Sequence, residues 1–376
     1  MQLNSRLLAN PPSLIREIGK QAAKIPGSIA LTIGEPDLDA PFPVARQISE
    51  AILSGDTHYP PNAGIEPLRA ACADFVNSRF HSEYHSENAL ITIGSTEALA
   101  SALFAILNPG DEVIVPVPAF GLYKPQIEMA GGVFVPMDIS SDDFEITESR
   151  LSSVLSPRTR AILFASPNNP TGTVLSPPSL SVLKSAALAH DLYLIADSVY
   201  DQLIYIPQMP SLCGDPDLFD RLIYVSGLSK AYAMTGVRLG YALADARVMT
   251  QMIKAHSFLV VSAPGCIQTG CKAVFETDIS SSVQEYKRRR DLVCEALLQM
   301  HLPFKVPSGA FYIFPDISSS GLSDWEFCSR LLNEQKLALI PSQAFGTPNH
   351  VRISYCYSDT VLNEGLHRLS LFLKTL

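Results

Sequence analysis

The feature that most constrains the fold of this chain is a regular alternation of short apolar runs and helical patterns between residues 89 and 225. The run Ala161–Ala165 is apolar throughout, as expected for a parallel strand buried on both faces. Strands that alternate with helices form right-handed βαβ units, which predict an α/β fold with a mostly parallel central sheet. The strands are expected at Ala89–Ile93, Glu112–Val115, Val133–Pro136, Ala161–Ala165, Leu192–Ala196 and Leu222–Val225.

The pattern changes after about residue 275. A long helix is expected over 279–300, a shorter one over 323–335, and strands at Ala310–Phe314 and Val351–Tyr355. The basic run Lys287–Arg290 falls within the long helix, and we expect it to form a solvated face.

The length of 376 residues is enough for two domains and a large buried core. We predict a large domain over residues 46–275 and a smaller α+β domain over residues 276–376. Residues 1–45 are expected to form an N-terminal segment that joins the small domain.

Charge and composition exclude several classes of protein. The net charge of −9 argues against nucleic acid as a partner. No apolar run approaches the roughly 20 residues that a membrane span needs, and the first residues lack the pattern of a signal peptide. The seven cysteines form no CxxC pair and lie in apolar runs, as buried thiols do in a reducing compartment. We therefore expect a cytoplasmic protein that binds no membrane, and no metal site is predicted.

One lysine stands in a loop of small residues directly after the strand Leu222–Val225. Lysine forms Schiff bases with carbonyl groups when its surroundings lower its pKa. Small neighbours such as Ser229 let a flat cofactor approach the backbone near Lys230, and Arg238 is suited to binding a phosphate. The alternative is an exposed lysine on a surface loop, which is the common case for a lysine.

Polar residues follow the carboxyl ends of other predicted strands, where open α/β sheets bind ligands. Ser95 and Thr96 begin a helix after a strand, so their backbone N–H groups can hold a phosphate. Asp197 ends a buried strand and needs a cationic or hydrogen-bonding partner, such as a protonated pyridine nitrogen, unless it caps a helix. Asn169 lies in a turn rich in proline and glycine, which could also be a turn without a ligand. Neither GxGxxG nor GxxxxGK occurs, so dinucleotide-binding and P-loop folds are excluded.

Two further residues complete the candidate site. Phe120 follows a strand and could cover a flat ring, although an aromatic residue there can also be core. Arg352 lies within the apolar strand Val351–Tyr355, where it would face a carboxylate of the protein or of a bound substrate.

Together these motifs resemble the class I/II aminotransferases, which are fold-type I pyridoxal-phosphate enzymes. The resemblance covers nearly the whole chain, from Gly34-Glu35-Pro36-Asp37 to Arg352. Its most specific parts are the turn Asn169-Pro170-Thr171-Gly172 and the stretch from Ser229 to Tyr241 that contains Lys230. It implies the three-layer fold of that family, pyridoxal 5'-phosphate as cofactor, and a homodimer with shared active sites.

The resemblance also implies a role for each candidate residue. Lys230 would be the Schiff-base lysine, and Asp197 would pair with the pyridine nitrogen. Asn169 and Tyr200 would hydrogen-bond the phenolic oxygen of the ring, and Phe120 would stack on it. Arg352 would bind the substrate α-carboxylate, helped by Asn169 and the backbone of Gly34. The cofactor phosphate would be held by Ser95, Thr96, Ser229 and Arg238, and by Tyr59 of the neighbouring subunit.

The predicted function is therefore transfer of the amino group of an α-amino acid to a 2-oxo acid. No second arginine stands in a position typical of the family. The residues expected near the substrate side chain are mostly apolar: Leu14 and Ile15 of the N-terminal segment, and those around Phe120 and Tyr123. We therefore expect a neutral, apolar or aromatic donor, with 2-oxoglutarate as acceptor. A β-C–S lyase of the same fold is the alternative, because the same cofactor residues serve both reactions. A regulator that uses the fold to bind an effector is disfavoured, because residues 1–30 are too few for a DNA-binding domain.

Overall fold

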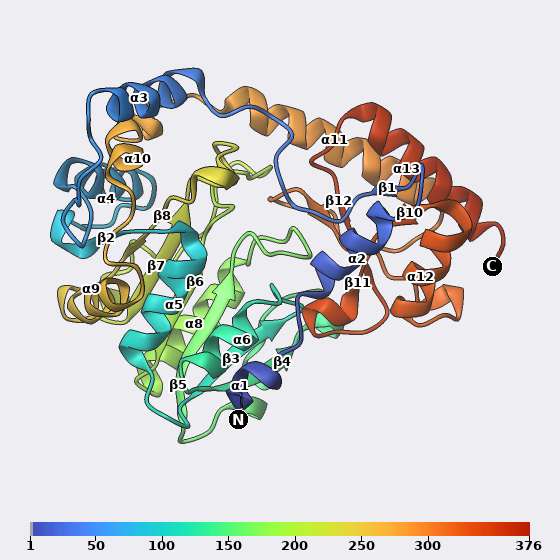
Figure 1. Ribbon diagram of the computed structural model, residues 1–376. Coiled ribbons are helices and arrows are strands. Elements are labelled where there is room, and N and C mark those ends of the chain that lie inside the picture. Colours follow the sequence, from blue (N-terminus) through green and yellow to red (C-terminus); the bar gives the residue numbers. More distant parts are fainter. Residues whose placement is uncertain (1–2) are drawn as a thin grey trace.

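The computed structural model describes residues 3–376 and is organised around a seven-stranded sheet (Figure 1). The strand order is β2-β8-β7-β6-β5-β3-β4, and β8 runs antiparallel to both of its neighbours while the other pairs are parallel. The prediction of a mostly parallel sheet is thus confirmed. The strands are β2 (Ala89–Thr92), β3 (Glu112–Val117), β4 (Val133–Asp138), β5 (Thr159–Ala165), β6 (Tyr193–Asp197), β7 (Leu222–Gly227) and β8 (Gly240–Leu243).

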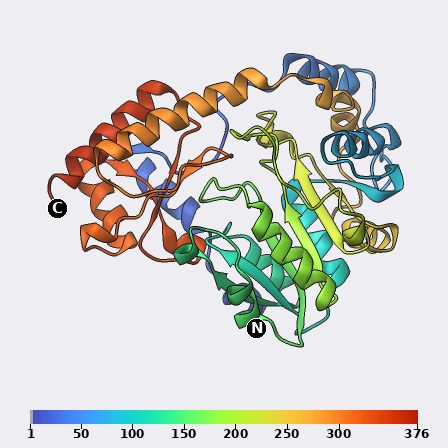
Figure 2. The ribbon, with the colours of Figure 1, turned by 180° about the vertical axis from the view of Figure 1, so that it is seen from behind.

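Helices cover both faces of this sheet and give three layers (Figures 1 and 2). Successive side chains of β5 point to opposite faces of the sheet. Ala161 and Leu163 belong to the apolar cluster on one face, and Ile162 and Phe164 to the cluster on the other, so both faces need a covering layer of helices. One face packs against α5 (Gly94–Ile106), α6 (Tyr123–Met129) and α9 (Ala246–Val260). The other face packs against α4 (Glu66–Phe80), α7 (Glu148–Val154) and α8 (Pro177–Ala189).

The ends of several elements follow directly from local sequence. At the start of α8 the Ser176 hydroxyl accepts a hydrogen bond from the Ser179 backbone N–H, and Pro177 occupies the first helical position. Asp245 caps α9 through the Arg247 N–H. These caps fix where each of the two helices begins, and with it the length of the loop that follows the preceding strand.

A second group of elements forms beside the three layers and has its own apolar cluster. Its antiparallel sheet has the order β11-β12-β9, and β1 of the N-terminal segment pairs in parallel with β10. The division at residues 45 and 275 stays a prediction. The elements are β1 (Ile29–Ala30), β9 (Tyr312–Ile313), β10 (Leu337–Ala338), β11 (Ile340–Pro341), β12 (Val351–Ser354), α11 (Ser280–Gln299), α12 (Asp324–Gln335) and α13 (Asp359–Leu373). The remaining helices are α1 (Ser5–Leu8), α2 (Leu14–Ala23), α3 (Phe42–Leu53) and α10 (Gly265–Gly270).

The basic run of α11 is not wholly solvated: Arg289 is buried and Arg290 is only partly exposed, so that prediction was wrong for these two residues. Arg289 is buried and pairs with Asp37 at 2.7 Å and with Glu285 at 2.8 Å. It lies three residues after the buried Tyr286, on the same face of the helix. Arg289 thereby ties the loop around Asp37 to α11.

Over residues 3–376, no helix is both long and apolar enough to cross a membrane.

Candidate active site

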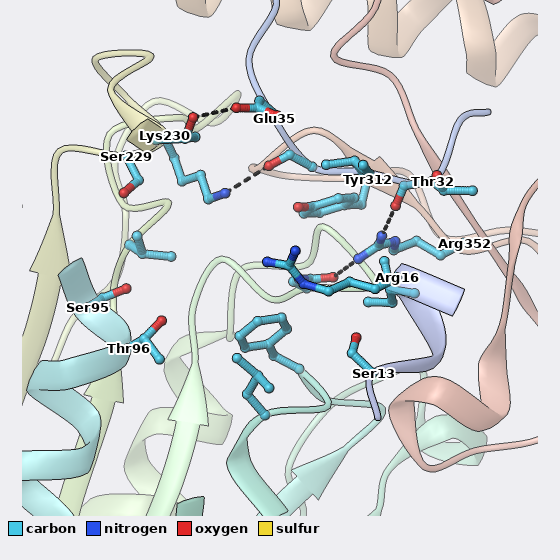
Figure 3. A pocket seen from close by; sticks show the side chains of 18 of the residues that line it. Ser13, Arg16, Thr32, Glu35, Ser95, Thr96, Ser229, Lys230, Tyr312 and Arg352 are labelled. Carbon is cyan, nitrogen blue, oxygen red and sulfur yellow. Dashed lines mark hydrogen bonds between the residues drawn. The ribbon is translucent and has the colours of Figure 1, made fainter. Parts of the chain in front are cut away.

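A cavity of about 870 Å³ lies where the carboxyl ends of the central strands meet the N-terminal segment and the C-terminal elements (Figure 3). Eleven of the twelve residues proposed from the sequence line it. They are Gly34, Ser95, Thr96, Phe120, Asn169, Asp197, Tyr200, Ser229, Lys230, Arg238 and Arg352. Tyr59 does not: its side chain is 87% exposed in the loop between α3 and α4. The fold thus brings together residues that are more than 300 positions apart in the sequence.

Lys230 extends from the loop after β7 into this cavity (Figure 3). Burial lowers the pKa of its ammonium group from 10.5 to about 8, because the charged form loses solvation. Its Nζ donates a hydrogen bond of 2.8 Å to the carbonyl oxygen of Gly34. An amine with this pKa is partly neutral near physiological pH, and a neutral amine is a nucleophile and a base.

Asp197 ends β6 with its carboxylate buried at the wall of the cavity. Burial raises its pKa, and two hydrogen bonds oppose that effect. The Tyr123 hydroxyl donates to Oδ2 at 2.7 Å, and the Val199 backbone N–H donates to Oδ1 at 3.2 Å. The bond to Val199 resembles a cap, but the Tyr123 bond holds the carboxylate toward the cavity. The sequence placed Tyr123 near the substrate side chain but did not predict its hydrogen bond to Asp197.

One end of the cavity is built to hold an anion. Ser95 and Thr96 occupy the first turn of α5, where free N–H groups and the helix dipole attract negative charge. Gly94 precedes them with φ +71°, and a Cβ there would lie 2.5 Å from Arg238 Nη2. Glycine therefore lets the guanidinium lie against the start of the helix. Ser229 lines the same cavity from the lysine loop.

Arg352 is a buried cation without a carboxylate partner in the part of the chain that the structure describes. It donates to Asn169 Oδ1 at 2.8 Å and to the carbonyl oxygen of Thr32, and its Nε has no hydrogen-bond partner within the described residues. Its guanidinium stacks on Tyr312, 4.5 Å from the ring centre. A buried charge is costly unless it is paired, so this arrangement fits an anionic ligand.

The ring of Tyr312 forms a wall of the cavity that sequence reasoning missed. Its hydroxyl lies 2.8 Å from that of Tyr200. A Cβ on Gly34 would lie 1.5 Å from the Tyr312 hydroxyl oxygen, so only glycine leaves room for this ring. Tyr312 lies in the predicted aromatic strand, but its sequence position gave no signal of a role in the site. Phe120 also lines the cavity and meets Tyr123 edge to face, at 5.8 Å between ring centres.

The N-terminal helix contributes a further residue that was not proposed. Arg16 of α2 extends its guanidinium into the cavity (Figure 3). An arginine on a solvent-accessible helix carries no local signal in the sequence that its side chain faces a site.

The comparisons with known proteins agree with this geometry. The model of the family "Aminotransferase class I and II" matches residues 26–369. The putative aminotransferase YugH of Bacillus subtilis is 37% identical over 370 residues, covering 96% of each chain. The aromatic-amino-acid aminotransferase 2 of Thermococcus litoralis is 36% identical over 387 residues, covering 100% of this chain and 99% of that protein. The structure of an aspartate aminotransferase from Thermotoga maritima superposes with a TM-score of 0.95 at 35% identity, covering 99% and 100% of the two chains.

A family match over nearly the whole length, together with close structural similarity, determines the fold and the reaction class. The chain belongs to the aminotransferase class I and II family and is an aminotransferase, one of a class of enzymes that work with pyridoxal 5'-phosphate.

Proposed function

We propose that this enzyme binds pyridoxal 5'-phosphate at Lys230 and transfers the amino group of a neutral, apolar or aromatic α-amino acid to 2-oxoglutarate. One observation carries the proposal: a half-buried lysine with a pKa of about 8 lies in a cavity with an anion-binding end and a buried arginine that has no carboxylate partner within residues 3–376. A reactive amine between two anion-binding positions suits a phosphorylated aldehyde and a substrate carboxylate.

The residues present fit the proposed cofactor. Ser95, Thr96, Ser229 and Arg238 supply hydroxyl groups, backbone donors and a cation for a phosphate. Asp197 supplies a buried carboxylate, which needs a cationic partner such as a protonated ring nitrogen. Tyr200 and Asn169 lie on the same cavity wall and can hydrogen-bond a phenolic oxygen, and Phe120 offers an aromatic face.

Different residues of the chain then have different roles in the reaction. When bound, the cofactor supplies an aldehyde that joins the substrate amine and a ring that accepts the electrons of the Cα–H bond. With the cofactor bound, Lys230, once its amine is free and neutral, would be the base that takes the proton from the substrate Cα and the acid that returns it to C4′. Asp197 holds a proton on the ring nitrogen, and Tyr123 keeps the Asp197 carboxylate oriented through its hydrogen bond.

Arg352 positions the substrate. Its guanidinium can hold the α-carboxylate through two parallel hydrogen bonds, while Asn169 and the carbonyl of Thr32 fix its orientation. Every α-amino acid has this carboxylate, so Arg352 does not select a side chain. Apolar and aromatic residues line the rest of the cavity and support an apolar or aromatic donor: Ile15, Leu99, Phe120, Leu122 and Tyr123.

Borohydride reduction of the loaded enzyme tests the cofactor assignment. Peptide mass mapping is expected to place the pyridoxyl group on Lys230, and Lys230→Ala is expected to lose the yellow colour. A modified Lys124 or Lys254, or no modified lysine, would contradict the assignment.

A panel of amino donors tests the substrate class. The common amino acids are paired with 2-oxoglutarate and with pyruvate and ranked by kcat/KM. We expect apolar and aromatic donors to lead, with differences of about 10- to 200-fold between side chains that differ by one methylene. A wide lead for aspartate would contradict the proposed donor class. Release of pyruvate, ammonia and homocysteine from cystathionine without amino transfer would indicate a β-C–S lyase instead.

We also propose that the enzyme is a homodimer in which Tyr59 reaches the phosphate of the neighbouring subunit. In support, Tyr59 lies outside the cavity of its own chain and is 87% exposed. Large apolar side chains nearby in sequence are exposed as well, including Phe42 at 76% and Leu53 at 86%. Mixing Tyr59→Phe with Lys230→Ala should restore tight cofactor binding in half of the sites of the mixed dimer. No recovery, with subunit exchange demonstrated, would indicate that Tyr59 acts within its own chain.

The domain organisation and location are proposed on similar grounds. The pairing of β1 with β10 supports an N-terminal segment, residues 1–45, that joins a small domain over residues 276–376. The large domain then spans residues 46–275. All seven cysteines are free, and six of them are buried, which supports a reducing, cytoplasmic location.

A further inference from the structure

Arg16 enters the cavity from the N-terminal helix α2 (Figure 3). The opposite face of the helix is anchored, because Ile18 and Ala22 are buried in the main apolar cluster. This anchoring holds the backbone of Arg16 at the rim of the cavity, while its side chain remains accessible to solvent. In Figure 3 the Arg16 side chain extends from α2 into the cavity, toward Lys230.

The charge of Arg16 is not neutralised by the rest of the described chain. Within residues 3–376 no carboxylate lies within 4.0 Å of its guanidinium. Lys20, one turn further along α2, lines the same cavity but pairs with Glu17 at 2.8 Å. Of the two cations that α2 places at the cavity, Arg16 is therefore the one free to bind a ligand.

The cavity as a whole has an excess of positive charge. Its five basic residues are Arg16, Lys20, Lys230, Arg238 and Arg352, and its two acidic residues are Glu35 and Asp197. Glu35 accepts a hydrogen bond from Thr235 at 2.6 Å, and Asp197 accepts one from Tyr123. Under the proposed function, Arg238 serves the cofactor phosphate and Arg352 the α-carboxylate. Arg16 remains as a cation for a second carboxylate of the substrate.

We infer that Arg16 binds the distal carboxylate of a dicarboxylic 2-oxo acid, the acceptor in the second half of the reaction. The inference rests on the proposed function and extends it, because it identifies the residue that selects a dicarboxylate over a monocarboxylate. The two substrates of an amino transfer occupy one cavity in turn, so the same walls must accept an apolar side chain and a carboxylate. A guanidinium at the solvent-accessible rim meets both needs, since it can remain hydrated beside an apolar donor and pair with an anionic acceptor.

Three variants test this role. Arg16→Gln removes the charge, Arg16→Lys keeps it, and Lys20→Gln is the matched control because it removes the paired cation of the same helix. Each is assayed with one amino donor held constant and with 2-oxoglutarate or pyruvate as acceptor. For Arg16→Gln we expect kcat/KM to fall about 10- to 100-fold with 2-oxoglutarate and to stay within about twofold with pyruvate. Arg16→Lys should retain most of the preference, and Lys20→Gln all of it.

A binding measurement separates recognition from chemistry. Glutarate and pentanoate have the same chain length but differ by one carboxylate, and neither can react. Calorimetry on the loaded enzyme should show that Arg16→Gln weakens glutarate about 10- to 100-fold and leaves pentanoate unchanged. An equal loss for both acids, or none for either, would overturn the inference and assign Arg16 a structural role or none.

The two proposals fail in different ways. If no donor transfers its amino group to any acceptor, the proposed function is wrong. If wild-type enzyme transfers amino groups but uses 2-oxoglutarate no better than pyruvate, the proposed reaction type survives and the role of Arg16 is refuted.

Discussion

Replacing Lys230 by methionine is expected to stabilise the cofactor-free protein at neutral pH, although it removes the reactive amine. The pKa of Lys230 falls from 10.5 in an unfolded chain to about 8 in the folded protein, because burial disfavours its charge. Below pH 8 the folded protein therefore holds a poorly solvated ammonium group that the unfolded chain exposes to water. This destabilisation is fully present below pH 8 and is lost as the pH rises from 8 to 10.5.

The size of the effect follows from the same two values. The difference in pKa corresponds to about 3 kcal/mol of folding free energy at pH 7 and to about 1.4 kcal/mol at pH 9.5. Methionine also loses the hydrogen bond to the Gly34 carbonyl, which offsets about 1 kcal/mol of the gain. The net stabilisation at pH 7 is about 2 kcal/mol, or roughly 2–3 °C in the unfolding midpoint for a chain of this length.

Thermal unfolding of cofactor-free Lys230→Met and of the wild type, at pH 7 and pH 9.5, measures this difference. Lys254→Met is the matched control, because Lys254 is exposed and its charge is solvated in both states. We expect the Lys230 variant to unfold at a higher temperature at pH 7, with most of the gain gone at pH 9.5. An unfolding midpoint below that of the wild type at pH 7, or a gain that does not decrease at the higher pH, would refute the argument that burial disfavours the charged form of Lys230.

Three further substitutions test the site. Asp197→Asn is expected to lower kcat by roughly 100-fold or more with the fold intact, since a neutral amide cannot hold a proton on the ring nitrogen; circular dichroism and steady-state kinetics check this, and near wild-type turnover would contradict it. Tyr123→Phe removes a hydrogen bond that lowers the pKa of Asp197. The acid limb of the pH–rate profile should therefore move to higher pH, and kcat should fall about 10-fold. A pH–rate profile that does not move would show that this bond is unimportant. Gly34→Ala places a Cβ 1.5 Å from the Tyr312 hydroxyl and must displace that ring, so KM for both substrates should rise by about 10-fold or more; an unchanged KM would show that Tyr312 can move freely.

The sequence predicted the site residues best where a polar residue stands at the carboxyl end of a predicted strand. Asp197 ends a strand of the mostly parallel sheet, and Lys230 and Ser95 follow two others; strands that run in one direction bring their carboxyl ends to one edge. Their meeting in one cavity was therefore predictable from the alternation of strands and helices. Strand β8 was not predicted: Gly240–Leu243 is a four-residue strand that follows the lysine loop, and it pairs antiparallel with β7 without a crossover helix.

Other contacts depend on packing between elements that are far apart in the sequence. The bond from Tyr123 to Asp197 needs the start of α6 to meet the end of β6, and no local pattern encodes that distance. Arg16 lies more than 200 residues from Lys230, and only the docking of α2 decides that its side chain faces the cavity. The prediction for Arg289 failed for a related reason. Four consecutive side chains on a helix point to different sides around its axis, so at least one residue of the basic run had to lie on the buried face.

The pairing of β1 with β10 has a consequence for how the protein is made. Ile29 and Leu337 are neighbours in the folded chain, but about 300 residues separate them along the sequence. During synthesis at about 5–20 residues per second, the first strand waits roughly 15–60 s for its partner to emerge. Throughout that interval α2, Gly34 and the apolar residues around Leu31 have no permanent docking surface. The nascent N-terminus is therefore the segment on which we expect chaperones to act. The walls of the substrate cavity are complete only when the ribosome has made nearly the whole chain.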